Sequence, residues 1–447
     1  MVLLDTPRHT HSANRGWAIT AAVLWVAAAA LFLYYLGTAP DEVSATELET
    51  TLPRAAALAA DNQPGTDATT VDTAFATTTM LPPTTITLPP TTATASTTTE
   101  PPTTTTTVPP PLTVAASGDV LGDRDVGIFM DKHGGEPVFA QVRPFLETAH
   151  LAFVNIEGPI SDKGARASWK QYTFRARPAL IDGLVSAGID VVSLANNHTV
   201  DYGTSALLDT IARLDEAGVC HAGAGADAAG ASAPALLITP AGIVAVLAFT
   251  DIIPGGFTAT SDAPGVAATT PDRKKLLASV AAANEWADFV IVSFHWGTEY
   301  TPHAGQDQRK LAHQVVDAGA DLILGHHPHV IQGLELYRNR LIAYSLGDFV
   351  WDHYSRETGE TFVLRVTMPR AGPPSIEVVP VYLDSPTGVP APVTGDEADA
   401  ILSRLVRLSA SLGLELTISG DRVHFEPAPG SATAPSAATG TTATSTP

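Results

Sequence analysis

Two short motifs carry most of the side chains that are able to bind a metal ion or to move a proton. Asn196, Asn197 and His198 form the first motif, and His326, His327, Pro328 and His329 form the second. Carboxamide oxygens and neutral imidazoles are ligands for borderline divalent metals. Because Pro328 favours an extended backbone at His327, and alternate residues of an extended chain project to one side, His327 and His329 should converge. His326 should then face away, and the two motifs together predict a metal site.

Three further polar side chains, Asp119, Glu157 and His295, also stand at the ends of apolar, strand-like runs. Taken alone, Asp119 is typical of a turn and Glu157 of a solvated strand end. In an open α/β sheet, however, the carboxyl ends of the strands lie along one edge, where ligands bind. We therefore expect these side chains to share one hydrolase-like metal site with the two motifs. Asp201, three residues after His198, is expected to hold that imidazole in one tautomer.

From residue 112 onward, strand-like and helix-like segments alternate, which predicts an α/β fold with partly parallel sheets. Strands are expected at 112–117, 151–155, 190–194, 243–249, 289–294, 322–324 and 341–345. Helices are expected at 177–187, 205–217, 272–287, 306–318 and 396–412. Residues 361–368 and 375–382 have no helix between them, so we expect an antiparallel pair that closes the sheet.

Two stretches of equal length, 187–198 and 318–329, repeat one another. In each stretch a helix ends at Ala-Gly, an Asp opens a strand, and the strand leads into a polar loop that ends at a histidine. Glycine after a helix fits the left-handed cap conformation. Any αβ unit would share the first part of this pattern, but only a shared site explains ligand-type residues at the same distance afterwards.

Six motifs stand at or near these strand ends. They are GDV from Gly118, NIEGP from Asn155, ANNHTVDYG from Ala195, HWGTEY from His295, GHHPHVIQG from Gly325 and YSLGDF from Tyr344. In this order, over residues 112–384, they resemble the capsule-synthesis CapA family (poly-γ-glutamate synthesis), which is related to the calcineurin-like metallophosphatases. The resemblance implies a metallophosphatase-like βα sandwich with mixed sheets and a dinuclear centre of two divalent metal ions, either Mn, Fe or Zn.

The resemblance also implies roles for individual residues. The metal ligands would be Asp119, Glu157, Asn197, His295, His327 and His329. His198, with Asp201 beside it, would be the general acid or would stabilise the transition state. The chain departs from the family pattern in two places. The family usually has a Met and an Arg soon after the first Asp, whereas this chain reads GDVLGDRDVG, in which Arg124 would be the displaced counterpart of that Arg. The late motif of the family usually ends Gly-Asn-Phe, and here Asp348 replaces the Asn. These departures bear on substrate contacts more than on metal binding.

The composition limits the classes of partner. Acidic residues outnumber basic ones, with 46 Asp and Glu against 25 Lys and Arg. This excess argues against a nucleic-acid partner, because phosphate binding requires clustered cations. It suits a soluble surface outside the cytoplasm, or a site that needs carboxylates for cations. The only cysteine, Cys220, excludes a disulfide within the monomer.

The 447 residues divide into five parts by composition. Residues 17–37 contain an uncharged apolar run of about 20 residues, which is long enough to span a bilayer as a signal-anchor helix. Basic residues before this run and acidic residues after it place residues 1–16 in the cytoplasm. The Thr/Pro-rich linker at 38–111 and the tail at 427–447 are expected to be disordered, and residues 112–426 to form the folded domain. A cleaved signal peptide is the alternative to the anchor, and it also leaves the domain outside the cytoplasm.

The sequence therefore predicts a membrane-anchored, extracytoplasmic, metal-dependent hydrolase-like protein of capsule or envelope polymer synthesis or export. Its substrate would be a phosphoester or a γ-glutamyl polymer, and the residues do not choose between an anionic polymer and a phosphorylated compound. Other capsule-synthesis components would be its partners. The alternative is a non-catalytic component that binds or assembles the envelope polymer.

Overall fold

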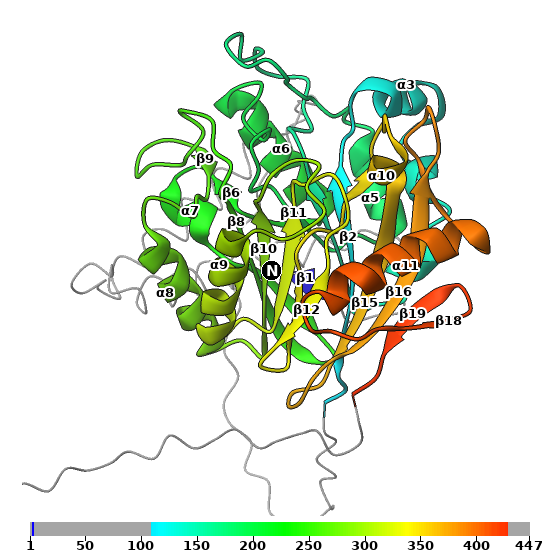
Figure 1. Ribbon diagram of the computed structural model, residues 1–447. Helices are drawn as coiled ribbons and strands as arrows, with labels where there is room; N and C mark the ends of the chain where they lie inside the picture. The colour runs from blue at the N-terminus through cyan, green and yellow to red at the C-terminus, as the bar shows by residue number, and fades with distance from the viewer. Residues whose placement is uncertain (1, 4–108, 428–447) are drawn as a thin grey trace, which may run out of the picture. The chain divides into compact units, whose positions relative to one another are not determined.

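The computed structural model describes residues 2–3 and 109–427, which are coloured in Figure 1. These residues include the whole of the predicted domain at 112–426. The predicted membrane anchor and the Thr/Pro-rich linker up to residue 108 lie outside the described residues, as does the predicted tail from residue 428. Among the described helices, none is long and apolar enough to cross a membrane.

Two large β-sheets form the centre of the domain. The first sheet contains, in spatial order, β1 (Val2–Leu3), β7 (Ala235–Thr239), β8 (Gly242–Thr250), β10 (Phe289–His295), β11 (Leu322–His326), β13 (Arg340–Ala343) and β12 (Leu334–Tyr337). The second contains β18 (Thr417–Ser419), β19 (Arg422–Phe425), β16 (Ser375–Leu383), β15 (Glu360–Met368), β2 (Leu112–Val120), β3 (Leu151–Ile156), β4 (Val191–Ser193) and β5 (Cys220–Ala222). Beside its path, β14 (Asp348–Val350) pairs with β2, and β17 (Pro390–Pro392) pairs with β16.

Helices and short connections surround the sheets. The helices are α3 (Arg124–His133), the 3₁₀ helix η1 (Glu136–Phe139), α4 (Arg143–Leu146), α5 (Leu180–Ala187), α6 (Thr204–Ala217), α7 (Ala228–Ser232), α8 (Arg273–Asn284), α9 (Gln306–Asp317), α10 (Arg356–Gly359) and α11 (Asp396–Ala410). A separate small sheet pairs β6 (Ala224–Gly225) with β9 (Gly265–Val266). Figure 1 shows α8 and α9 on one side of the domain and α3 and α5 on the other.

Strand residues alternate between two buried faces, which gives the domain four layers. In β3, Leu151 and Phe153 lie in the core between the sheets, whereas Ala152 and Val154 pack with residues of α3 and α5. Residues of β10 alternate in the same way between the inter-sheet core and the core under α8 and α9. Strands that are buried on both faces are largely apolar, and their charged or imidazole side chains fall at or near their ends.

The predicted mixed α/β architecture is confirmed. Strands β8, β10, β11 and β13 are parallel neighbours in one sheet, and β2, β3, β4 and β5 are parallel neighbours in the other. The predicted antiparallel pair corresponds to β15 and β16, which run from the pair Glu360 and Tyr382 to the pair Thr367 and Ser375. Strand β15 is also antiparallel to β2, so it joins this pair to the parallel strands.

Several predicted boundaries differ from the structure: the helix expected at 272–287 ends at Asn284, and the strand expected at 341–345 ends at Ala343. Two further differences bear on the site. The first strand continues to Val120, so Asp119 lies inside β2 and not in a turn beyond it. Helix α5 begins at Leu180, three residues after its predicted start. The N–H of Arg177 donates to the carbonyl of Gly122 at 2.9 Å, so tertiary pairing holds this part of the chain away from the helix.

The internal repeat corresponds to two equivalent α-to-β units. Helix α5 leads into β4, and α9 leads into β11. In both units the opening Asp binds the second residue of the neighbouring parallel strand: Asp190 Oδ2 accepts from the N–H of Ala152, and Asp321 Oδ2 accepts from that of Val290, each at 2.8 Å. The same side-chain contact at equivalent positions fixes how each unit begins, although β11 continues to His326, two residues beyond the position equivalent to the end of β4 at Ser193.

The segment after β3 is fastened to helix α6 by the buried carboxylate of Asp209. Lys163 Nζ lies 2.6 Å from Asp209 Oδ1, and Ser161 Oγ donates to Asp209 Oδ2 at 2.7 Å. Arg213 Nε donates to the same oxygen at 2.9 Å. Burial raises the pKa of Asp209, but these three donors outweigh burial and hold the pKa below its ordinary value. The charged carboxylate therefore stabilises the fold.

We expect Asp209→Asn to lower the free energy of unfolding by about 2 kcal/mol at pH 7, because hydrogen bonds to a charged group are lost. A carboxyl group whose pKa is depressed by folding contributes its stability above the unfolded pKa, about 4, and loses it as the pH falls through the folded pKa. The difference between wild type and variant should therefore shrink when urea unfolding is measured at pH 3 instead of pH 7.

Glu216→Gln is the matched control, because Glu216 is an exposed carboxylate on the same helix. It should change the free energy of unfolding by less than about 0.5 kcal/mol at both pH values. A cost of Asp209→Asn that is the same at pH 3 and pH 7 would contradict the role given to the charge.

Candidate metal centre

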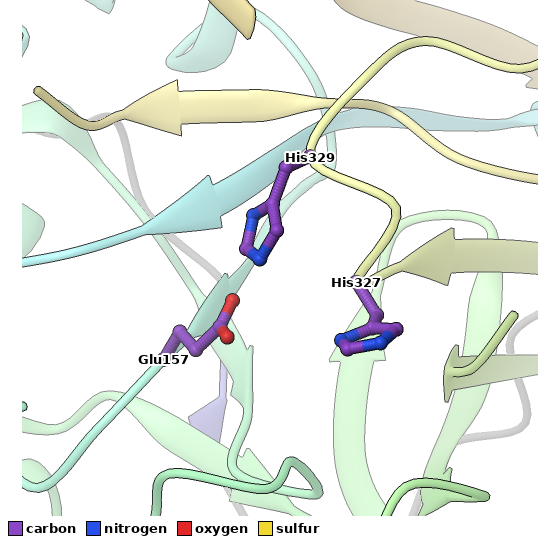
Figure 2. Close-up of side chains that lie close together, drawn as sticks. All are labelled: Glu157, His327 and His329. Carbon is purple, nitrogen blue, oxygen red and sulfur yellow. The ribbon is translucent and has the colours of Figure 1, made fainter. Parts of the chain in front are cut away.

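The side chains singled out in the sequence meet where strands of both sheets end. Asp119 lies near the end of β2, Glu157 follows β3 directly, and His295 is the last residue of β10. The loops after β4 and β11 contribute Asn197, His198, His327 and His329. All of these side chains are buried, and Figure 2 shows Glu157 facing the imidazoles of His327 and His329.

A close approach of two backbone segments fixes Asp119 in the site. A Cβ atom on Gly118 would lie 1.8 Å from the carbonyl oxygen of Gly347, so a larger residue at this position would push the two segments apart. The N–H of Asp119 donates to the same carbonyl at 3.0 Å. This contact allows β2 and β14 to pair, with Asp119 opposite Asp348.

His327 and His329 converge, as the sequence predicts, but the reason given above is wrong. Both residues have positive φ, 95° for His327 and 57° for His329, so the loop is not extended. Tertiary hydrogen bonds hold this conformation: the N–H of His327 donates to Asp119 Oδ2 at 3.1 Å, and the N–H of Tyr300 donates to the carbonyl of Pro328 at 2.8 Å. Left-handed backbone is costly for residues with a Cβ and is concentrated at functional sites.

His326 faces away from the site, as predicted. Its Nδ1 lies 3.3 Å from Ser293 Oγ, and its Nε2 lies 3.3 Å from the carbonyl oxygen of Ser117. Burial lowers the pKa of His326 to about 4. His326 is therefore a neutral imidazole with polar contacts on both ring nitrogens, and it connects the two sheets beneath the site.

One group of potential ligand atoms surrounds His295 Nε2. Asn197 Oδ1 lies 2.8 Å from this nitrogen, His327 Nδ1 lies 3.2 Å from it, and Glu157 Oε1 lies 3.7 Å from it. These four atoms come from four different strand ends. Carboxamide, carboxylate and imidazole donors in such a cluster suit a borderline divalent metal ion.

A second group surrounds His329 Nδ1. Asp348 Oδ1 lies 2.8 Å from this nitrogen, and Asp119 Oδ2 lies 3.9 Å from it. Asn155 Nδ2 donates to the other oxygen of Asp119 at 2.8 Å, which orients the carboxylate. Glu157 connects the two groups, because its ligand atoms lie within 4.8 Å of those of His327 and His329 and also of those of Asp119 and His295.

Among the described residues, the buried carboxylate of Glu157 lacks the hydrogen bonds that a buried charge normally requires. Both carboxylate oxygens of Glu157 are buried, and neither has a hydrogen-bond partner in the described part of the chain. A buried carboxylate without a partner is costly, and a bound cation removes that cost. The residues that surround Glu157 are the donor types that divalent metals use, so this arrangement fits a metal centre.

The electrostatics of the site also favour a bound cation. Burial, aided by the nearby Asp119 carboxylate, raises the pKa of Glu157 well above its ordinary value. Burial also raises the pKa of Asp119 to about 7. Burial lowers the pKa of His329, but Asp348 and Glu157 outweigh burial and raise that pKa to about 10. Without a bound cation, the site thus contains several buried acidic groups and only one imidazolium to offset their negative charge. Divalent cations would supply the missing positive charge.

His198 belongs to the site but has a different set of contacts. Its Nδ1 lies 2.6 Å from Asp201 Oδ2, as the sequence predicts, and its Nε2 faces Glu157 Oε1 at 3.7 Å. Asp201 Oδ2 also accepts from the N–H of Phe174 at 2.8 Å, and the Phe174 ring stacks on the His198 imidazole with centroids 4.0 Å apart. The ring nitrogen that points into the ligand cluster is therefore Nε2.

Lys170 is a site residue that the sequence analysis missed. Its Nζ lies 2.5 Å from Asp201 Oδ1, 2.5 Å from the carbonyl oxygen of Asn197 and 3.0 Å from His198 Nδ1. The side chain is mostly buried, and burial lowers its pKa. Lys170 lies in a long loop between β3 and α5 without a strand-end pattern, so no signal in the sequence marked it.

The two residues that mark departures from the family pattern, Asp348 and Arg124, lie in different parts of the structure. Asp348, expected to bear on substrate contacts, contacts His329 directly and so belongs to the ligand cluster. Arg124 lies outside this cluster, where its guanidinium lies 2.9 Å from Asp352 and stacks over the rings of Phe174 and Trp351.

Fold and site together define a four-layered α/β domain with a buried cluster of carboxylate, carboxamide and imidazole groups where strands of the two sheets end. The model of the family described as "Bacterial capsule synthesis protein PGA_cap" matches residues 113–353, and the chain belongs to this family. The predicted resemblance to capsule-synthesis proteins is thereby confirmed.

Individual relatives are similar over most of their length. The chain is 34% identical over 290 residues to "Capsule biosynthesis protein CapA" of Bacillus anthracis, covering 63% of this chain and 70% of that protein. It is 31% identical over 287 residues to "PGA biosynthesis protein CapA" of Bacillus subtilis (strain 168), covering 64% and 74%. A solved structure described as a novel phosphatase from Mycoplasma pneumoniae is 14% identical, covering 63% of this chain and 90% of that one. Its TM-score of 0.33 is too low to bear on fold or function.

Proposed function

We propose that this protein is a metal-dependent hydrolase of capsule or envelope polymer synthesis or export, built on a metallophosphatase-like βα sandwich. The observation that carries the proposal is the buried carboxylate of Glu157, without hydrogen-bond partners in the described residues, between two groups of imidazole and carboxylate atoms. The names of the Bacillus relatives, which refer to capsule and PGA biosynthesis, support the biological setting. Figure 2 shows the part of this centre on which the proposal rests.

The site would hold two divalent metal ions, Mn, Fe or Zn, one in each group of ligand atoms. The ligands would be Asp119, Glu157, Asn197, His295, His327 and His329. Glu157 would contribute to metal binding at both groups, because its carboxylate lies near the ligand atoms of each. Asp348 would orient His329 through the 2.8 Å contact to Nδ1, or would itself take a coordination position.

Bound metals would lower the pKa of a water molecule to near neutrality and stabilise the charge that develops during hydrolysis. His198 would give or take the proton at Nε2. A carboxylate only accepts hydrogen bonds, so the contact of Asp201 with His198 Nδ1 keeps the proton on Nδ1 and leaves Nε2 for chemistry. Lys170 would hold the Asp201 carboxylate and the Asn197 backbone in place.

The substrate would be a phosphoester or a γ-glutamyl polymer, and in either case an anionic compound. The relation of the sequence motifs to metallophosphatases favours the phosphoester, and the names of the relatives favour the polymer. A non-catalytic polymer-binding component remains the alternative from another class. Metal content and hydrolysis, measured on the same preparation, separate these candidates.

We further propose that residues 17–37 anchor the protein in the cell membrane with residues 112–426 outside the cytoplasm, where other capsule-synthesis components would be its partners. The apolar run and its flanking charges support this arrangement. A chain anchored in this way has its amino terminus on the opposite side of the membrane from the domain. It could not keep the pairing of β1 with β7, so β7 would be the edge strand of its sheet.

We expect the full chain, purified in detergent and reconstituted with Mn, Fe or Zn, to bind about two metal ions per chain. Glu157→Gln should lose most of this metal, measured by elemental analysis, because the carboxylate that lies near both groups of ligand atoms is gone. Without metal, the same variant should be at least as stable as wild type, since it removes an uncompensated buried acid. Wild type should gain about 2.7 kcal/mol from metal at one hundred times the Kd, and the variant should not.

His303→Ala is the matched control for metal binding, because His303 is an exposed histidine outside the ligand cluster. It should keep the metal content and the metal-dependent gain in stability. A wild-type protein that binds none of the three metals would contradict the proposed hydrolase.

We expect His198→Asn to reduce hydrolysis of bis(p-nitrophenyl) phosphate, a model phosphodiester, by about 10²- to 10⁴-fold while leaving the metal content unchanged. The reason is that His198 provides the proton-transfer group and not a metal ligand. A γ-linked glutamate oligomer, assayed for new amino groups, tests the second substrate class in parallel. Full metal content without hydrolysis of either substrate would favour the non-catalytic alternative.

An epitope tag at each end of the chain tests the proposed anchor. We expect the amino-terminal tag to stay on the membrane-bound protein and to resist protease added outside the cell, while the carboxyl-terminal tag is digested. Loss of the amino-terminal tag, together with release of the domain from the membrane, would show a cleaved signal peptide instead.

A further inference from the structure

A cavity with a basic and aromatic lining lies beside His198. It has a volume of about 280 Å³, and its walls include Arg124, Arg166, Gln171, Tyr172, Phe174 and Tyr202. This volume lies just below the range of about 300–1,000 Å³ in which proteins hold drug-sized ligands, so the cavity fits one small group or monomer.

Shared aromatic walls connect this cavity to the metal centre. Phe174 lines the cavity and stacks on His198 with ring centroids 4.0 Å apart. The guanidinium of Arg124 lies 5.0 Å from the Phe174 centroid and 5.5 Å from that of Trp351, and the Trp351 ring is 4.8 Å from the His329 ring. A group held in the cavity would therefore be one ring away from the proposed proton-transfer group.

Positive charge is concentrated in the segment that forms most of the cavity. Residues 161–179 contain five Lys or Arg and one Asp, although the whole chain has a net charge of −21. Three of these cations, Lys163, Lys170 and Arg177, form ion pairs with aspartates. Arg166 and Arg175 form no ion pair with any residue in the described ranges.

The uncommitted cations lie at the cavity. Arg166 lines it, and its NH2 donates to the carbonyl oxygen of Gln171 at 3.3 Å, which leaves the rest of an exposed guanidinium available. The guanidinium of Arg175 lies 4.4 Å from the ring centroid of Tyr202, another wall residue. Arg124 completes the lining, but Asp352 at 2.9 Å already balances its charge.

Exposed aromatic side chains cluster around the same region. Tyr172 is 64% exposed and lines the cavity, and Trp169 is 61% exposed in the same loop. Tyr354, which is 81% exposed, accepts a hydrogen bond from Arg124 at 3.3 Å. Tyr300 is 62% exposed, with its ring 6.0 Å from that of His329. Large exposed aromatic side chains beside a cavity mark a binding surface.

We propose that this cavity is a subsite for an anionic group of the substrate, a carboxylate or a phosphate, that flanks the bond on which the metal centre acts. Arg166 supplies the charge, because a guanidinium binds either anion through two parallel hydrogen bonds. Arg175, which lies over the Tyr202 ring and has no ion-pair partner among the described residues, adds positive charge beside the cavity. The exposed aromatic rings cover the part of the substrate that carries the anion. This assignment of the subsite rests on the hydrolase function proposed above.

The test uses the full chain in detergent, loaded with Mn, and a fluorescein-labelled γ-linked hexaglutamate whose binding is followed by anisotropy. We expect Arg166→Gln to raise the Kd for this probe about tenfold, equivalent to about 1.4 kcal/mol. Arg166→Lys keeps the charge and should stay within about threefold of wild type, since only the bidentate geometry is lost. In 1 M salt, where the screening length is about 3 Å, the difference between wild type and Arg166→Gln should nearly disappear.

Lys274→Gln is the matched control, because it removes an exposed positive charge from α8, on the other side of the domain (Figure 1). It should leave the Kd unchanged. Inorganic phosphate, titrated as a competitor, distinguishes the two sources of the anion. An effect of Arg166→Gln on hexaglutamate alone supports a carboxylate subsite, and an effect on phosphate alone supports a phosphate subsite.

Unchanged affinity of Arg166→Gln for both probes overturns the proposal, as does an equal effect of Lys274→Gln, which would mean binding by overall charge. Metal content and hydrolysis of bis(p-nitrophenyl) phosphate are measured on the same preparations. If these two readouts fail but Arg166→Gln still weakens probe binding, the subsite stands without the hydrolase. If they succeed and the affinities do not change, the hydrolase stands without the subsite.

Discussion

The structure depends on the burial of acidic side chains at the junction of its two sheets. Asp119, Glu157 and Asp348 lie there with almost no exposed surface, and burial raises the pKa of each. Such a junction is stable only if protons or bound cations offset the charge. The surrounding strands are apolar and buried on both faces, which excludes water from the site. The ligand atoms at the ends of these strands therefore decide which cation fits.

Much of the fold and most of the cluster could be predicted from the sequence, because strands buried on both faces are largely apolar and place their charged or imidazole side chains at or near their ends. The repeat of 187–198 and 318–329 was informative for a second reason. Asp190 and Asp321 make the same bond to a neighbouring strand, so sequence similarity in this case reflects equivalent three-dimensional positions. The roles of individual residues, as metal ligand or as proton donor, came only from the family resemblance. The spacing of residues along the chain does not imply these roles.

The remaining features depend on contacts between segments far apart in the sequence. The positive φ of His327 requires Asp119, some two hundred residues earlier, to accept its N–H. Lys170 reaches Asp201 from a loop without periodic pattern, and Asp348 reaches His329 only because β14 pairs with β2. Local sequence rules describe propensity and periodicity, and neither contains information about which distant carboxylate a side chain will meet.

One loop connects chemistry with recognition. Residues 161–179 provide Lys170, which holds Asp201, and Phe174, which stacks on His198 and also lines the basic cavity. An anion bound to Arg166 would contact the same loop that orients His198, the proposed proton-transfer group. Binding energy from a part of the substrate remote from the reacting bond could then be used to align His198, which is how enzymes turn recognition into rate.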